Sequence, residues 1–426
     1  MRITPWASAQ RRGGGSDALR RAIALAAIAA LACGAAACGS SNDRTATAGG
    51  DSSRTSGDPI KVGAIVTVKG ALDYSAAPAG AEAYFKALNE RGGINGRPVE
   101  IETVNDESDP SRAAAAARKM LGGGVVAMVG SDSTVDCAAN DQLYRAKQAI
   151  NLVALASNPT CLASPNQVTV VHTAAALNAA ALLVDKLHKK RVVYITFDAP
   201  AGRSSAQVVE RFLKQRGALG GASEFVQPGK DPSASISRVK RRNPDGIVIL
   251  ALYPIATAII KGLDQQGLTP SNGVDIASVL GLYEQQTPEV LGKSGEGVYV
   301  VLDFEPLQAK DPDPEVLRWR AAMQKHVPDK PLSALAQAGW VAADIFTQAA
   351  KTIHGEITPA KVTAAVKSIR KFESGMLPCP AMIGDQQAYP MIHRCHNVVQ
   401  IKNGAWTQRD DLGVLMLPPK GFSLAP

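Results

Sequence analysis

The chain has 426 residues, a formal net charge of +8 and 20% charged residues, and this length predicts two hydrophobic cores rather than one. The first 37 residues hold five Arg and one Asp, so half of the charge excess belongs to them and +4 remains. This mild excess, without interleaved aromatic residues, argues against nucleic acid as a partner, and the run Lys240-Arg241-Arg242 fits a solvated helix end.

The N-terminal segment has the pattern of an export signal. The basic pair Arg20-Arg21 precedes an apolar run at 22–32, and small residues follow the run. About eleven apolar residues are too few to span a bilayer, so the pattern predicts a cleaved secretory signal peptide over residues 1–37 rather than a permanent anchor. The mature protein is therefore expected to be exported.

The end of this signal resembles the acylation site of bacterial lipoproteins. Cys38 follows the small residues 35–37 and precedes Gly-Ser-Ser. The resemblance implies a lipid anchor at Cys38 on the outer face of the cell membrane, in the periplasm or at the cell surface, with a flexible tether over 38–58. Ala35 stands where lipoproteins usually have Leu or Val, and Cys33 is a competing site. An ordinary cleaved signal with a chance cysteine is the alternative.

The other four cysteines predict disulfide bonds, because an even number of cysteines in an exported protein indicates pairing. Nearest pairing joins Cys137 to Cys161 and Cys379 to Cys395. In the chain-entropy model, each loop of this size would stabilise the fold by about 3 kcal/mol.

Hydrophobic periodicity predicts alternating strands and helices in the first half of the mature chain. The predicted elements, in order, are a strand at 60–66, a helix around 81–88, a strand at 99–104, a helix at 111–121, a strand at 125–129, a helix at 135–149 and a strand at 151–155. Asp109 and Pro110 have the residue types that favour the N-cap and the first turn of the second helix. Gly92-Gly93 predicts the end of the first helix.

The alternation continues in the second half. The predicted elements are a helix at 174–189, a strand at 191–196, helices at 203–217 and 233–242, a strand at 246–251, a helix at 255–267, strands at 274–279 and 297–302, helices at 313–325, 333–353 and 359–370, and a hairpin at 397–413. Asn403-Gly404 predicts the turn of the hairpin. Two strand–helix series predict an α/β protein with two doubly wound parallel sheets, each covered by helices on both faces.

Several motifs then resemble one family. A strand containing Gly63 is followed by Asn-x-x-Gly-Gly-Ile-x-Gly at 89–96, Asp-x-x-Asp-Pro at 106–110 and Val-Gly at 129–130. This order resembles the periplasmic branched-chain amino-acid-binding proteins, which are solute receptors of ABC importers and have the type I periplasmic-binding-protein fold. The resemblance continues through Ala-Leu-Ala-Ser-Asn-Pro at 154–159 and covers essentially all of 59–410.

The resemblance implies two lobes that are joined by a hinge of three crossovers and bind ligand between them. The first lobe would comprise 59–173 plus 303–388, and the second 174–302 plus 389–426. The family often has a disulfide near the first-lobe cleft, which supports the pair Cys137–Cys161. The implied function is that of an ABC-importer binding subunit, which would capture a small carboxylate ligand, an amino acid or a related organic acid, and deliver it to membrane permease subunits. The protein is expected to be a monomer.

The segment 130–134 is the first candidate binding site, because it lies between a strand and a helix. A helix N-terminus offers free N–H groups and a partial positive charge to an anion. The resemblance implies that the ligand carboxylate binds here, beside Ser133 and the hydroxyl group of Thr134. The alternative is that these two side chains only cap their own helix.

The second candidate site follows the strand at 151–155, since ligands of doubly wound sheets bind beyond the carboxyl ends of strands. It comprises Leu155, Ala156 and Ser157, and the resemblance gives Ser157 a hydroxyl and an N–H contact and Leu155 a carbonyl contact. A local turn is the alternative. Tyr74 and Tyr253 are candidates for an aromatic wall around an apolar ligand.

Two positions depart from the family pattern. Ala201 stands where the family usually has a Tyr that reaches the ligand, and Leu280 stands where its amino-acid receptors have an acidic residue for the α-ammonium group. Glu284, one helical turn further on, could replace that acid only if the loop shifts. Because a buried ammonium without a counter-charge is costly, we expect a carboxylate without an α-amine to bind more tightly than its amino counterpart.

No cofactor, metal or catalytic site is expected, and the protein is not expected to be an enzyme. Gly122-Gly123-Gly124 lacks the Lys-Ser/Thr of a phosphate-binding loop. His393, Cys395 and His396 resemble a metal cluster, but Cys395 has a disulfide partner and no regular ligand spacing completes the set. The alternatives to an importer subunit are a ligand-sensing receptor domain of the same fold and, more distantly, an exported hydrolase.

Overall fold

The structure is a computed structural model that describes residues 55, 57–156, 162–172, 175–383 and 392–423. The predicted signal peptide, including Cys33 and Cys38, lies outside these residues. The helices and strands belong to one compact unit within 51–426. Across the described residues, every helix is too short or too polar to cross a membrane.

The first sheet contains five parallel strands in the order β4-β1-β5-β6-β7. They are β1 (Ile60–Val66), β4 (Val99–Asn105), β5 (Met128–Ser131), β6 (Asn151–Ala156) and β7 (Gln167–His172). The sequence analysis did not identify β7, whose Gln167 and Thr169 interrupt the apolar run, and it placed β5 about two residues too early. A short hairpin of β2 (Val68–Lys69) and β3 (Leu72–Asp73) follows β1.

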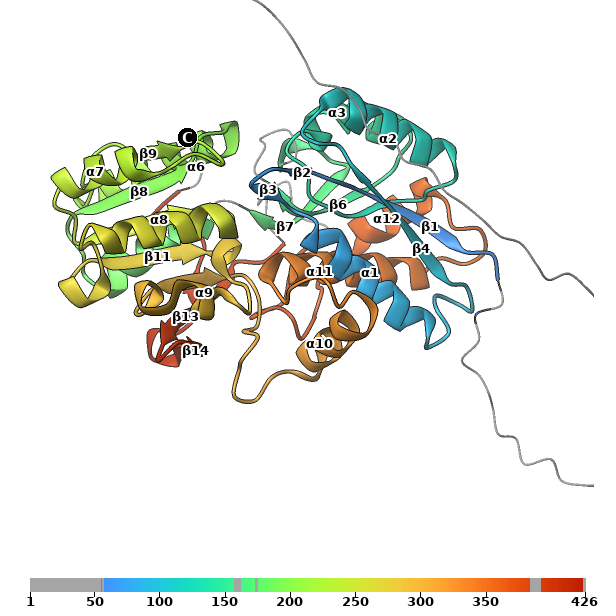
Figure 1. The fold of residues 1–426 in the computed structure, drawn as a ribbon. Helices are drawn as coiled ribbons and strands as arrows, with labels where there is room; N and C mark the ends of the chain where they lie inside the picture. Colours follow the sequence, from blue (N-terminus) through green and yellow to red (C-terminus); the bar gives the residue numbers. More distant parts are fainter. Residues whose placement is uncertain (1–54, 56, 157–161, 173–174, 384–391, 424–426) are drawn as a thin grey trace, which may run out of the picture. The chain divides into compact units, whose positions relative to one another are not determined.

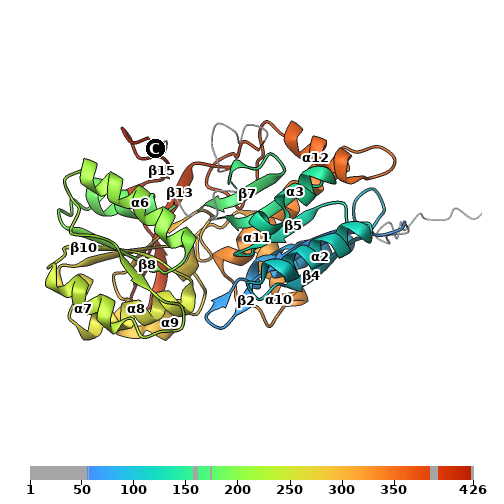
Figure 2. The same ribbon diagram turned by 90° about the horizontal axis from the view of Figure 1, so that it is seen from above.

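Helices cover both faces of this sheet. Figures 1 and 2 show α2 (Pro110–Gly122) and α3 (Asp136–Ala146) side by side on one face. The opposite face is covered by α1 (Ala76–Asn89) and the long helix α11 (Ala334–Lys351), which pack closely against each other. Two further helices, α10 (Pro314–His326) and α12 (Pro359–Ser368), contact α1 and α11 respectively.

The second sheet has the order β14-β13-β12-β11-β10-β8-β9, and β15 also pairs with β13. Its strands are β8 (Val192–Phe197), β9 (Glu224–Val226), β10 (Gly246–Leu250), β11 (Asp275–Val279), β12 (Tyr299–Leu302), β13 (Cys395–Lys402), β14 (Ala405–Gln408) and β15 (Leu415–Met416). Strands β8 to β12 are parallel, whereas β13 is antiparallel to β12. The hairpin of β13 and β14 turns at Asn403 and Gly404, whose φ angles of 52° and 72° confirm the predicted turn.

Helices also cover both faces of the second sheet. One face carries α6 (Pro200–Gln215) and α5 (Ala175–Ala181), which contact each other. The other face carries α7 (Ser233–Arg241), α8 (Tyr253–Gln265) and α9 (Thr287–Leu291), which Figure 1 shows in front of the strands. The helix predicted at 174–189 is shorter, because α5 passes into a π-helical turn at Leu182–Lys186. Two doubly wound sheets confirm the predicted fold class, while the lobe boundaries stay a prediction.

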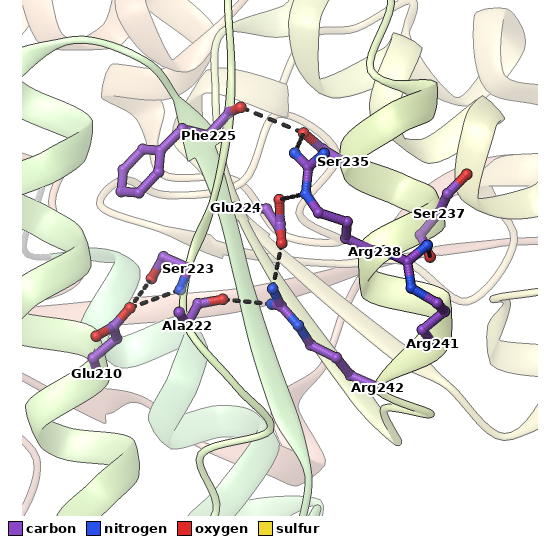
Figure 3. Close-up of polar contacts among 10 residues, drawn as sticks. All are labelled: Glu210, Ala222, Ser223, Glu224, Phe225, Ser235, Ser237, Arg238, Arg241 and Arg242. Atoms are coloured by element: carbon purple, nitrogen blue, oxygen red, sulfur yellow. Dashed lines mark hydrogen bonds and ion pairs between the residues drawn. The ribbon is translucent and has the colours of Figure 1, made fainter.

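One residue of the basic run at the end of α7, Arg242, forms an internal ion pair (Figure 3). Glu224 of β9 is buried, and its carboxylate pairs with the guanidinium groups of Arg238, at 2.7 Å, and Arg242. Because a buried carboxylate needs a partner, these contacts have a structural role. The expectation of a wholly solvated helix end was therefore wrong for Arg242.

The disulfide bond predicted between Cys379 and Cys395 is present. Cys137 is also disulfide-bonded, and its predicted partner, Cys161, lies outside the described residues.

Candidate ligand-binding site

A cavity lies at the carboxyl ends of strands from both parallel sheets. The cavity itself has a volume of about 40 Å³, and about 560 Å³ of space lies between its walls when the opening to solvent is counted. The residues that line it from the first sheet and its loops are Tyr74, Asp132, Ser133, Thr134, Leu155 and His172. The remaining lining residues are Ala175, Phe197, Leu250, Ala251, Leu252, Val279, Leu280 and Gly281.

Parallel topology explains why these residues meet. The carboxyl ends of parallel strands lie at one edge of a sheet, which is where ligands of doubly wound folds bind. In the first sheet β5, β6 and β7 end there, and in the second sheet β8, β10 and β11 do. The two walls differ chemically, because the polar side chains come from the first sheet and the second contributes only apolar residues and glycine.

Ser133 acts as a cap of α3, which is the alternative that the sequence left open. Its Oγ accepts hydrogen bonds from the backbone N–H groups of Val135, at 3.1 Å, and Asp136, at 2.9 Å, and donates one to the carboxylate of Asp106. These contacts occupy two of the N–H groups that a helix N-terminus could otherwise offer to an anion.

Thr134 also has internal partners. Its backbone N–H donates to Oγ1 of Thr67 at 3.1 Å, and its hydroxyl oxygen lies 3.0 Å from Oγ of Ser108. The side chain is exposed on the cavity wall. A ligand carboxylate at this turn would therefore compete with existing hydrogen bonds.

Asp132 lies in the predicted segment 130–134 and lines the cavity, but its side chain was not itself named as a candidate for ligand contact. Its side chain is only 2% exposed, and the buried oxygen Oδ2 has no hydrogen-bond partner. Burial raises the pKa of this carboxyl group well above its usual range. The nearby phenol of Tyr74 also has a raised pKa, chiefly through burial and further through the charge of Asp132.

The surroundings of Asp132 add no positive charge. The buried carboxyl groups of Asp106 and Asp136 lie at the same edge of the sheet, and the pKa of Asp136 is raised mainly by burial. Asp136 accepts hydrogen bonds from Tyr144 and Asn151. None of the described lining residues is Lys or Arg, so the polar wall is acidic.

His172 is the second lining residue that was missed, because β7 was not identified. Burial is the main cause that lowers the pKa of its imidazole to about 4, against an opposing effect of Asp303. The ring is therefore neutral near pH 7, with one nitrogen that can donate and one that can accept a hydrogen bond.

Only some of the other predicted site residues line the cavity. Tyr74 and Leu155 line the cavity together with Ser133 and Thr134. Ala156 is buried behind the wall, where it packs with Cys137 and Val153. Ser157 lies outside the described residues.

Tyr253 and Glu284 do not line the cavity. The carboxylate of Glu284 accepts a hydrogen bond from Gln286, and burial is the main cause that raises its pKa to about 7. Burial is the main cause that raises the pKa of Tyr253, and the charge of Glu284 adds to it, so these two side chains are near each other but away from the lining. Leu280 does line the cavity and is 4% exposed.

Comparison with solved structures gives the same fold. A leucine-binding protein from Thermotoga maritima superimposes with a TM-score of 0.67 at 20% identity, covering 84% of this chain and 99% of that one. A solute-binding protein of an ABC transporter from R. palustris, in complex with benzoate, gives a TM-score of 0.68 at 16% identity, covering 82% and 95% of the two chains.

Sequence comparison agrees. The chain is 25% identical over 330 residues to Leu/Ile/Val-binding protein homolog 1 of Brucella abortus, which covers 74% of this chain and 83% of the relative. The family model described as "Periplasmic binding protein" matches residues 59–405, which include the first sheet, strands β8 to β13 of the second sheet and every described lining residue of the cavity. Since that match spans well over half of the chain, the protein belongs to the periplasmic binding protein family.

Proposed function

We propose that this protein is the lipid-anchored solute-binding subunit of an ABC importer. It captures a small carboxylate-bearing ligand with an apolar body, an amino acid or a related organic acid, and delivers it to permease subunits in the membrane. The observation that supports this most strongly is the cavity at the carboxyl ends of both sheets, with one polar and one apolar wall. Leucine and benzoate, the ligands named for two of the similar proteins, share this combination of carboxylate and apolar body.

The apolar wall selects the body of the ligand. Phe197, Leu252 and Leu280 offer hydrocarbon surface and no hydrogen-bonding side chain. Burying a leucine-sized side chain contributes about 1.5–3 kcal/mol, which is roughly a ten- to hundred-fold gain in affinity.

The polar wall holds the carboxylate. The hydroxyl group of Tyr74 lines this wall and can donate to the carboxylate, beside the hydroxyl groups of Thr134 and Ser157 that the family resemblance implies. A ligand that touches both walls favours the conformation in which both contacts form. The permease subunits would then recognise that conformation.

Calorimetry with the mature protein tests this function. The panel contains aliphatic and aromatic amino acids and the corresponding carboxylic acids. Leu280→Ala should weaken binding about ten-fold, whereas Leu317→Ala, at a residue of α10 that is 50% exposed, should leave it unchanged. The proposal fails if no member of the panel binds, or if the two variants behave alike.

The anchor has its own test. Metabolic labelling with palmitate should acylate the wild-type protein and the Cys33→Ser variant but not Cys38→Ser. Labelling of Cys38→Ser would place the anchor elsewhere.

A further inference from the structure

We propose that Asp132 determines the specificity of the cavity by binding a cationic nitrogen of the ligand, an ammonium or amidinium group. The inference rests on the proposed function, because it assigns the chemistry of the ligand that the same cavity binds. It also reverses the expectation, drawn from Leu280, that the ligand has no amine.

The backbone holds Asp132 in the cavity. Its N–H donates to the carbonyl of Ile65 at 3.0 Å, and its own carbonyl accepts from the N–H of Thr67 at 3.0 Å. These bonds extend the sheet by one residue pair beyond β5. The side chain therefore cannot reach solvent by a small movement of a loop.

None of the described contacts gives the carboxyl group of Asp132 a structural role. Capping of α3 is performed by Ser133, and no Lys or Arg is paired with Asp132. A buried polar atom without a partner is costly, and it is usually explained by function or by a ligand. The lone oxygen Oδ2 at the cavity wall is such an atom.

The described lining favours a cation over an anion at this position, because it contains Asp132 and no Lys or Arg. Asp106 and Asp136 are buried at the same edge of the sheet, and His172 is neutral. The N–H groups at the start of α3 already have acceptors within the protein. An ammonium group would find an acceptor at Asp132, and its charge would favour the ionised form of a carboxyl group whose pKa burial has raised.

This assignment orients the ligand. The cationic nitrogen binds at the first sheet, and the apolar body points toward Leu280 and Phe197 on the second. A carboxylate on the same carbon atom reaches the neighbouring donors, Tyr74 among them. The counter-charge for an amine is thus located on the first sheet, and Glu284, which does not line the cavity, is not needed.

The test is calorimetry with three probes that share one apolar side chain: leucine, 4-methylpentanoate, which lacks the amine, and 3-methylbutylamine, which lacks the carboxylate. Phenylalanine, 3-phenylpropanoate and 2-phenylethylamine form a second series. The wild-type protein should bind each amine-bearing probe at least ten-fold more tightly than the acid that lacks the amine. Asp132→Asn, which preserves shape, should lower affinity for amine-bearing probes ten- to a hundred-fold and should not weaken binding of the acid. Glu284→Gln is the matched control and should change neither.

The outcomes separate the two proposals. If the acids bind as tightly as the amino acids, or if Asp132→Asn leaves amine binding unchanged, the inference is wrong while the proposed function stands. If only the amines bind, the inference stands and carboxylate capture is wrong. If no probe of either series binds, both are rejected. A circular dichroism spectrum and melting temperature of Asp132→Asn close to those of the wild type show that the variant is folded.

Discussion

The contact between α1 and α11 allows a sharp test of the packing that supports the cavity. Two glycines make this contact possible. A Cβ atom at Gly339 would lie 1.7 Å from the carbonyl oxygen of Ala77, and one at Gly80 would lie 1.9 Å from that of Ala336. Real Cβ atoms essentially never come closer than 3.0 Å to such an atom, so Gly339→Ala must separate the two helices.

The size of the effect follows from two opposing contributions. Replacing Gly by Ala in a helix interior usually stabilises by about 1 kcal/mol. Here the contact must lengthen from 1.7 to about 3.0 Å, a shift of roughly 1.3 Å against backbone. Overpacking of this kind typically costs about 1–3 kcal/mol and occasionally more. The cost should lie near the upper end of that range, about 3 kcal/mol, because a carbonyl group cannot rotate away as a side chain can. Subtracting the gain of about 1 kcal/mol leaves an expected net loss of about 2 kcal/mol.

The displacement should also reach the binding site. Helix α1 begins at Ala76, two residues after Tyr74, which lines the cavity. Gly339→Ala should therefore weaken ligand binding as well as stability.

Urea unfolding, followed by circular dichroism, measures the change with two matched controls. A Cβ at Gly262 of α8 would meet only the side chain of Ile236, with its flexible end Cδ1 nearest, and one at Gly122 of α2 would meet nothing within 4 Å. The stability order should be Gly122→Ala above Gly262→Ala above Gly339→Ala. If Gly339→Ala is as stable as Gly122→Ala, the close approach of the two helices is wrong.

Three further predictions concern stability. Burial raises the pKa of Asp344 to about 6, so the folded protein retains a proton that the unfolded chain releases above pH 4, and stability falls as pH rises through 4 to 6. Asp344→Asn should therefore be more stable than the wild type by up to roughly 3 kcal/mol above pH 6, with little difference below pH 4. Parallel pH profiles of the two proteins in urea unfolding would contradict this. Replacing both Cys379 and Cys395 by Ser opens a loop with a sequence separation of 16 and should cost about 3 kcal/mol in thermal unfolding, an effect that should vanish when both proteins are compared under reducing conditions. Ser133→Ala removes the cap of α3 and should cost about 1–2 kcal/mol, and a variant as stable as the wild type would show that the cap is dispensable.

The sequence by itself determined the features that depend on neighbouring residues. Asp109 caps α2 by accepting from the backbone N–H groups of Ser111 and Arg112, as its position before Pro110 predicts. The turn at Asn403-Gly404 also follows from local chemistry, because both residues tolerate positive φ angles. Strand and helix periodicity is likewise local, and it was sufficient to predict two doubly wound sheets.

Only the tertiary structure decided which side chains face the cavity. Asp132 and His172 lie at strand ends that are 40 residues apart in the sequence. Their burial depends on residues of the other sheet, such as Leu250 and Leu280. Glu284 was a candidate counter-charge from its sequence position, but the turn after Leu280 carries it away from the lining. An aspartate in the sequence does not show whether its carboxyl group lies in solvent or in a cavity. What differs is the desolvation that the packed elements impose, and that quantity exists only once the strands are assembled.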